Sequence, residues 1–151
     1  MRILGDTSPP PNNTGPAVAF TASPTITRTY GPGQTILFDN LITIVGGGYS
    51  TATSFFTCPQ DSVYAFHVSV YSQSGLKLHA TIHHSSRGEL VNALVDNTDE
   101  SVSGNQSSNL VIVECLAGEN VSVRAVGDIG QNLFVSFNYP SFSGYLIGSI
   151  P

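Results

Sequence analysis

Short alternating apolar segments, separated by turn residues, are the feature that most constrains how this chain can fold. Tyr64, Phe66 and Val68 take alternate positions in the longest of these segments, and a period of two places them on one face of a β-strand. The next segment, 76–83, alternates in the same way. No segment longer than about eight residues shows a helical period. About ten such segments predict an all-β fold, an antiparallel ten-stranded sandwich of the jelly-roll type.

The composition fits one domain with a weakly charged surface. The 151 residues lie close to the usual size of a single domain, about 100–150 residues. Only 10% of them are charged, against about 25% in an average soluble domain, so Ser, Thr, Asn and Gln must supply most of the polar surface. Residues 1–15 are rich in Pro and predict a flexible linker, and residues 16–151 predict the globular domain.

Charge and motifs exclude several classes of function. The net charge is −5, and the five basic residues are scattered along the chain, so we expect no binding to nucleic acid. No apolar run approaches the ~20 residues that span a bilayer, so we expect no membrane-spanning segment. The chain lacks a Gly-x-Ser-x-Gly elbow, and the apolar neighbours of Cys58 suit a buried sulfur better than a reactive one. We therefore predict that the protein is not an enzyme.

The histidines do not have the spacing of a metal site within one subunit. His79 and His83 are four residues apart, roughly 13 Å along a strand at about 3.3 Å per residue. One zinc ion, with bonds near 2.0–2.1 Å, cannot bridge about that distance. His83 and His84 are adjacent and point to opposite faces. We interpret the histidines as solvated or interface side chains. A metal site shared between subunits, with one histidine from each subunit, stays open.

Three further segments predict specific patterns of burial. Residues 109–116 have almost no polar face, which predicts a strand buried on both sides. Residues 35–45, which are apolar and β-branched, predict one strand that ends at the glycines from Gly46. Residues 96–108 form the longest polar run, which predicts a flexible exposed loop.

Aromatic residues at fixed spacings resemble the signature of the globular head domain of complement C1q and its relatives. The sequence Ser-Phe-Ser-Gly-Tyr-Leu at 141–146 is similar to the closing strand of that family. The resemblance covers residues 16–147 and implies a C1q/tumour-necrosis-factor-like jelly roll. The residues that carry this signature are Phe38, Tyr49, Phe56, Tyr64, Phe66, Phe142 and Gly144.

The resemblance also implies a function. Three copies are expected to pack around a threefold axis as a closed homotrimer. Members of the family are secreted recognition modules, and many act in innate immunity as lectin-like proteins that bind microbial carbohydrates, with weak sites repeated for avidity. The alternative is an extracellular signalling or matrix ligand of the same fold that binds a cell-surface receptor.

Polar loops are where such a ligand would bind. Their Asp, Asn and Gln groups suit sugar hydroxyls, and Tyr30 could stack on a sugar ring. The candidate ligand-binding residues are Tyr30, Asp96, Asp99, Glu100, Asn105, Asp128, Gln131 and Asn132. Calcium prefers several oxygen ligands from flexible loops, and some family members bind it near the trimer apex, so Asp96, Asp99 and Asp128 are candidate calcium ligands. Plain solvated loops, with no ion and no sugar, are the alternative.

The two cysteines leave two alternatives open. If Cys58 and Cys115 each end a predicted strand, both lie near one end of the sandwich. A disulfide, which needs Cα atoms about 4.4–6.8 Å apart, is then geometrically possible. The family phrase Phe-Thr-Cys-Pro carries its cysteine without a fixed partner. The resemblance therefore favours two buried free thiols over a disulfide.

Overall fold

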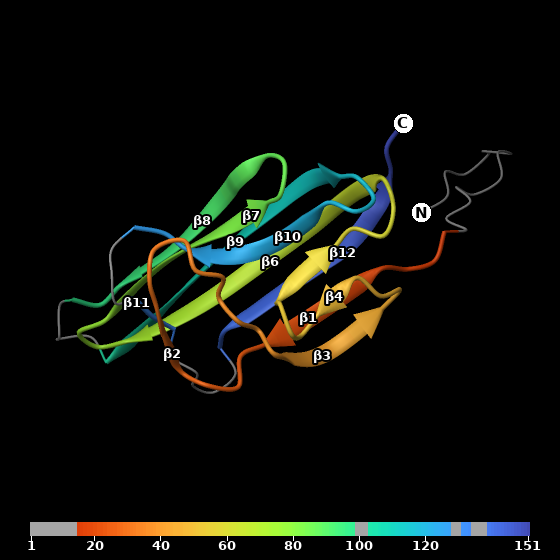
Figure 1. Ribbon diagram of the computed structural model, residues 1–151. Coiled ribbons are helices and arrows are strands. Elements are labelled where there is room, and N and C mark those ends of the chain that lie inside the picture. Colours follow the sequence, from red (N-terminus) through yellow and green to blue (C-terminus); the bar gives the residue numbers. More distant parts are fainter. Residues whose placement is uncertain (1–14, 99–102, 128–130, 134–138) are drawn as a thin grey trace, which may run out of the picture.

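A computed structural model of the chain describes residues 15–98, 103–127, 131–133 and 139–151 (Figure 1). Residues 1–14 of the predicted linker lie outside this part. The described part consists of β-strands joined by turns and contains no helix. The strands are β1 (Ala19–Ser23), β2 (Arg28–Tyr30), β3 (Asn40–Val45), β4 (Tyr49–Ser50), β5 (Phe55–Thr57), β6 (Ser62–Gln73), β7 (Lys77–His84), β8 (Gly88–Asp96), β9 (Gly104–Cys115), β10 (Asn120–Ala125), β11 (Gln131–Leu133) and β12 (Ser141–Ser149).

The strands form two five-stranded sheets that pack face to face as an elongated sandwich (Figure 1). We call them the β6 sheet, with the order β3-β1-β12-β6-β9, and the β7 sheet, with the order β4-β5-β10-β7-β8. β11 and β2 pair as a separate two-stranded sheet. Every pair of neighbouring strands is antiparallel. The predicted all-β, antiparallel jelly-roll architecture is therefore confirmed, with ten strands in the two large sheets and one small sheet added.

The signature aromatics lie in the core between the two sheets. All six are buried, Tyr49 being the most exposed of them at 8%. Phe142 is at the centre, because its ring contacts the rings of Phe20, Phe38 and Phe66 as well as Tyr49. Aromatic pairs at such separations add about 0.5–1.5 kcal/mol each beyond the area they bury. The residues that mark the family in the sequence are thus the residues that hold the two sheets together.

Gly144, in the middle of β12, leaves room for two of these rings. A Cβ at this position would lie 2.6 Å from Cε1 of Phe20 and 2.7 Å from Cδ1 of Phe66. We expect Gly144→Ala to lower the free energy of unfolding by about 1–3 kcal/mol, the usual cost of overpacking a core. Urea unfolding at fixed protein concentration measures the difference.

Gly148→Ala is the matched control for this prediction. Gly148 lies in the same strand, and a Cβ there would meet nothing within 4 Å. This variant should unfold at the same urea concentration as the parent or slightly above it. Equal stability of the two variants would show that the rings around Gly144 move aside at no cost.

Three of the predicted burial patterns are wrong in an informative way. The strand at 109–116 is buried on one face only, since Ile112 is 60% exposed while Val113 is 9% exposed. Only Asn40–Val45 of the segment 35–45 is a strand. Ile36, which precedes this strand, is fully buried without being in a strand. Its backbone N–H is satisfied there, because it donates to the carbonyl of Val123 at 2.8 Å. Residues 104–108, expected in a loop, begin β9 and pair with β6.

Cys58 and Cys115 form a disulfide, with their Cα atoms 6.2 Å apart. The two free thiols that the resemblance favoured are therefore wrong. Pairing of Ser62 with Cys115 places the end of β9 beside the start of β6. The N–H of Cys58 donates to the carbonyl of Glu119 at 2.8 Å. These two contacts bring the loop after β5 to the end of β9, which lies 57 residues later in the chain.

Candidate functional site

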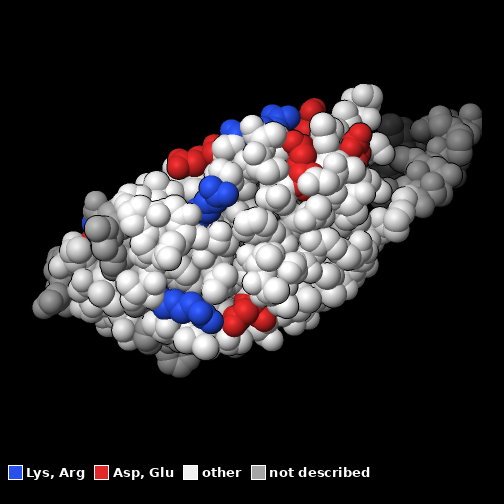
Figure 2. Space-filling view, in the orientation of Figure 1, with Lys and Arg blue, Asp and Glu red and all other residues white. Residues whose placement is uncertain are grey.

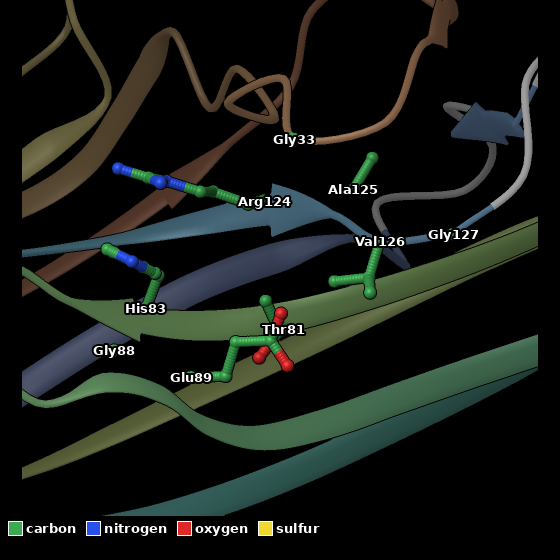
Figure 3. Close-up of a pocket in the computed structure, with 9 residues that line it drawn as sticks. All are labelled: Gly33, Thr81, His83, Gly88, Glu89, Arg124, Ala125, Val126 and Gly127. Carbon is green, nitrogen blue, oxygen red and sulfur yellow. The ribbon is translucent and has the colours of Figure 1, made fainter.

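A hollow on the outer face of the β7 sheet is the best-defined candidate binding site (Figure 3). We call it the polar hollow after the side chains of Thr81, His83, Glu89 and Arg124, although most of its exposed lining is apolar. Its volume is about 260 Å³. Pockets for drug-sized ligands begin at about 300 Å³, so this hollow suits a group of about one sugar ring. The residues that line it are Gly33, Thr81, His83, Gly88, Glu89, Arg124, Ala125, Val126 and Gly127.

Strand register brings the polar side chains of this hollow together. His83 of β7 lies directly opposite Glu89 of β8, just after a register shift between these strands. Thr81 of β7 lies opposite Arg124 of β10. Residues opposite one another in an antiparallel pair share a face, so all four point away from the core. Gly33 also lines the hollow, and its N–H holds it against β10 by donating to the carbonyl of Ala125 at 2.8 Å.

Several polar atoms at this hollow have no partner within the described residues. Nδ1 of His83 and Nε of Arg124 are buried and make no hydrogen bond. The hydroxyl of Ser122, opposite His83 in β10, is in the same condition. Buried polar atoms are satisfied in the great majority of native structures. Of these residues, His83 and Arg124 line the hollow, so a polar ligand bound there could offer partners to their unpaired nitrogens.

The charges at the hollow nearly balance. Burial lowers the pKa of His83 and the charge of Arg124 lowers it further, against a smaller opposing effect of the Glu89 carboxylate, so the imidazole is neutral at pH 7. Arg124 and Glu89 then contribute one positive and one negative charge. Figure 3 shows the side chains of His83 and Arg124 extending in the same direction, with the Glu89 carboxylate beside Thr81. The hollow therefore has a nitrogen-rich side and an oxygen-rich side.

A second feature is an uncovered apolar row across the β6 sheet. Val45, Ala19, Tyr145, Ala65 and Ile112 are successive cross-strand partners, one from each strand of the sheet. They share the face that points away from the core. The exposed fractions are 47% for Val45, 52% for Tyr145 and 60% for Ile112. Ala65 is only 1% exposed between these larger neighbours, so Val45, Tyr145 and Ile112 form the exposed part of the row. Exposed apolar side chains gathered on one face favour an interaction surface.

Comparison with known proteins decides the family. The family model for the C1q domain matches residues 19–147, which is most of the chain. This chain belongs to the C1q family. The predicted membership is therefore confirmed, and the fold shared with solved structures agrees with it.

Three solved structures show how far the fold of this C1q domain is shared. The globular domain of zebrafish complement 1qA protein is 19% identical, with a TM-score of 0.73 over 88% of this chain and 99% of that chain. Murine APRIL at pH 5.0 is 7% identical, with a TM-score of 0.69 over 87% of this chain and 99% of that chain. Eiger TNF from S. frugiperda is 11% identical, with a TM-score of 0.66 over 91% of this chain and 96% of that chain. At these identities the likeness concerns the fold alone.

Tyr30 of this C1q domain cannot serve as a stacking platform. Its exposed fraction is only 4%, and its hydroxyl accepts a hydrogen bond from the N–H of Leu37 at 3.0 Å. Burial raises the pKa of this phenol. The prediction that Tyr30 stacks on a sugar is therefore wrong, because the ring is packed into the core beneath the segment 31–37.

Two other predicted ligand residues lie near the turn between β6 and β7. This turn contacts the chain beside both of them, since Gly75 N–H donates to the carbonyl of Asn97 at 2.6 Å and Ser74 N–H donates to the carbonyl of Ser103 at 3.2 Å. Asp96 and Asn105, which flank these contacts, are both exposed. Gln131 and Asn132 belong to β11, where they pair through the backbone with β2, but their side chains lie outside the described residues. Asp99, Glu100 and Asp128 also lie outside them.

The candidate calcium site is only partly described. Oδ1 of Asp96 accepts hydrogen bonds from the N–H of Thr98 at 3.0 Å and from its hydroxyl at 2.7 Å. Asp96 is exposed, and a carboxylate is the kind of oxygen ligand that a hard cation prefers, but Lys77 lies directly opposite it in β7. Its two predicted co-ligands, Asp99 and Asp128, are outside the described residues. Calcium binding therefore stays a prediction.

The polar hollow was missed by the sequence analysis. Alternation in the segment 76–83 already placed His83 on the outer face. The remaining members, Glu89 and Arg124, follow in other strands. Only the register of β7 with β8 and β10 shows that they meet, and that register includes a shift that no local pattern announces.

Two histidines of this C1q domain predict how its stability depends on pH. The interpretation of His84 as a solvated or interface side chain is wrong, because this side chain is fully buried. Burial lowers the pKa of His84, and burial also lowers the pKa of His83. The unfolded chain therefore binds more protons than the folded chain below about pH 6.5. We expect the free energy of unfolding to have its full value above that pH and to fall as the pH is lowered toward 5. Urea unfolding at pH 7.5 and pH 5.0, at one protein concentration, measures this.

His84→Gln tests the assignment. This variant removes one of the two groups and should reduce the difference between pH 7.5 and pH 5.0. A parent protein that is equally stable at both pH values would contradict the prediction. Carboxylates titrate mainly below about pH 4.5 and contribute little to this window.

Proposed function

We propose that this protein is a secreted homotrimeric recognition module of innate immunity that binds microbial or other patterned glycans. The single observation that carries this proposal is the uncovered apolar row on the β6 sheet. A lone subunit would leave that row exposed to water. In a trimer around a threefold axis, each subunit covers the apolar row of a neighbour, and the closed assembly leaves no apolar row exposed for further association. The polar residues of the β7 sheet stay outside and remain accessible to ligands.

The surface outside this row suits hydroxyl-rich ligands. Figure 2 shows that charged side chains are few on this face and that most of them gather along its upper edge. Most of the remaining polar groups are hydroxyls and amides. One site of this kind binds a sugar weakly. Three linked sites raise the effective affinity by avidity when a surface displays many copies of the ligand. In our proposal, the protein binds and does not catalyse a reaction.

A glycan array and a bacterial pull-down test this function. Both use the full chain, with millimolar calcium and again with a chelator. We expect retention on at least one class of microbial glycan, and weaker retention of a monomeric variant than of the trimer. Retention that depends on calcium, and that Asp96→Asn weakens, would support the calcium site as well. No binding to any glycan or bacterium at millimolar calcium would overturn the proposal.

The second candidate is an extracellular ligand for a cell-surface receptor. The fold shared with murine APRIL and Eiger TNF favours it, although it concerns architecture only. No membrane-spanning helix occurs in the part of the chain that the structure describes. Binding to cells that persists after enzymatic removal of their surface glycans would favour this candidate over glycan recognition.

A further inference from the structure

We propose that the polar hollow of the β7 sheet selects acidic sugars, with the sugar carboxylate bound by Arg124 and the ring hydroxyls bound by Glu89 and Thr81. This inference rests on the proposed glycan recognition and names the ligand class of one site. It places the site on the strands, away from the loops that the sequence analysis favoured.

The nitrogen-rich side of the hollow is built to receive an anion. Nε of Arg124 and Nδ1 of His83 are buried and have no hydrogen-bond partner within the described residues. No carboxylate within that part lies in ion-pair range of Arg124, whereas Arg28 pairs with Asp39 at 3.8 Å and Arg87 pairs with Glu114 at 3.6 Å. An arginine with an unmet fork of donors binds carboxylates in a bidentate manner.

The oxygen-rich side of the hollow is built to accept hydroxyl donors. The Thr81 hydroxyl already donates to the carbonyl of Val91 at 3.2 Å, so its oxygen is left as an acceptor. The carboxylate of Glu89 has no ion pair or hydrogen-bond partner among the described residues and lies beside Thr81 in Figure 3. Each of these oxygens can accept a hydrogen bond from a ring hydroxyl. The two sides together match a ligand that carries an acid at one end and hydroxyls at the other.

The charge balance selects a singly charged ligand over a doubly charged one. Arg124 contributes one positive charge, His83 is neutral at pH 7, and Glu89 contributes one negative charge. A phosphate group, which carries about two charges at neutral pH, would be repelled by Glu89 without a second cation to offset it. A sugar carboxylate carries only one charge, and the ring hydroxyls of the same sugar can donate hydrogen bonds to Glu89. The volume of about 260 Å³ accommodates about one such ring.

A matched pair of ligands tests this selectivity directly. Glucuronate and glucose differ only in the carboxylate, so we titrate both into the full-length protein by isothermal calorimetry and by NMR of the histidine ring protons. We expect glucuronate to bind about 10- to 100-fold more tightly than glucose, the usual effect of a charge-assisted hydrogen bond. The ring resonances of His83, assigned through His83→Gln, should shift with glucuronate.

Three variants connect that selectivity to the hollow. Arg124→Gln should abolish the preference for glucuronate and leave thermal unfolding unchanged within a few degrees. Arg124→Lys, which keeps the charge without the planar fork, should keep only part of the preference. Arg28→Gln is the control, because Arg28 is an arginine on β2 that already pairs with Asp39, and it should bind as the parent does.

The outcomes separate this inference from the proposed function. Equal binding of glucose and glucuronate, or a preference that survives Arg124→Gln, would overturn the inference while leaving glycan recognition intact. Inorganic phosphate or sulfate that binds as tightly as glucuronate would also overturn it, because the hollow would then be a general anion site. If arrays show glycan binding and only acidic glycans lose retention in Arg124→Gln, both proposals are supported.

Discussion

Ile112→Asp is expected to break the proposed trimer and to give a folded monomer. Ile112 is 60% exposed in one subunit and lies in the apolar row that crosses the β6 sheet. In the proposed trimer each copy would bury a carboxylate that has no partner, and an uncompensated buried charge costs about 3–5 kcal/mol. The same carboxylate is solvated in a monomer, so the fold of one subunit is retained. Light scattering at micromolar concentration gives the mass, and the far-ultraviolet spectrum reports the fold.

Ile26→Asp is the matched control for this experiment. Ile26 is exposed to a similar extent, 56%, but lies in the bend between β1 and β2 and not in the apolar row. This variant should remain trimeric. A parent protein that is already monomeric at micromolar concentration would contradict the proposed assembly. An Ile112→Asp variant that stays trimeric would show that another surface forms the contact.

Phe142→Ala is expected to lower the free energy of unfolding by about 3–5 kcal/mol, the usual cost of deleting a buried phenylalanine. Its ring is fully buried and contacts four other aromatic rings of the core. Truncation leaves a cavity between the two sheets that these rings cannot fill without losing their own packing. Urea unfolding at fixed protein concentration is the measurement, because dissociation of a trimer would otherwise shift the midpoint.

Tyr145→Ala provides the contrast within the same strand. Tyr145 lies three residues further along β12, on the opposite face, and is 52% exposed. This variant should weaken self-association and should change the stability of the isolated subunit little. Phe142→Leu should lose less stability than Phe142→Ala, because more of the buried volume remains. If Phe142→Ala and Tyr145→Ala unfold alike, the assignment of the two faces of β12 is wrong.

The core of the fold could be predicted from local pattern alone. Alternation in β6 identified Tyr64, Phe66 and Val68 as core residues, and all three are fully buried. A strand has a side-chain period of two regardless of its neighbours, so one sequence window determines which residues share a face. The aromatic spacing extended this from single strands to the family, because each signature residue fills a place in one packed cluster.

The polar hollow and the disulfide could not be predicted in this way. His83, Glu89 and Arg124 come from three strands, and they meet only because of the register among those strands. A shift of one residue in either pairing would send one of them to the opposite face. The bond between Cys58 and Cys115 likewise depends on backbone contacts at the end of the sandwich, which leave no trace in residue spacing.

The sequence by itself determined that the chain is an all-β member of the C1q family and which residues fill its core, because strand periodicity and core packing are encoded in local order. It did not determine which apolar face stays uncovered. The segment 109–116 has almost no polar face, yet only one face of β9 packs against the core of the domain, and the other face leaves Ile112 exposed. Only the tertiary structure decided this, because burial depends on which sheet packs against each face, and that is set by contacts between strands far apart in the chain.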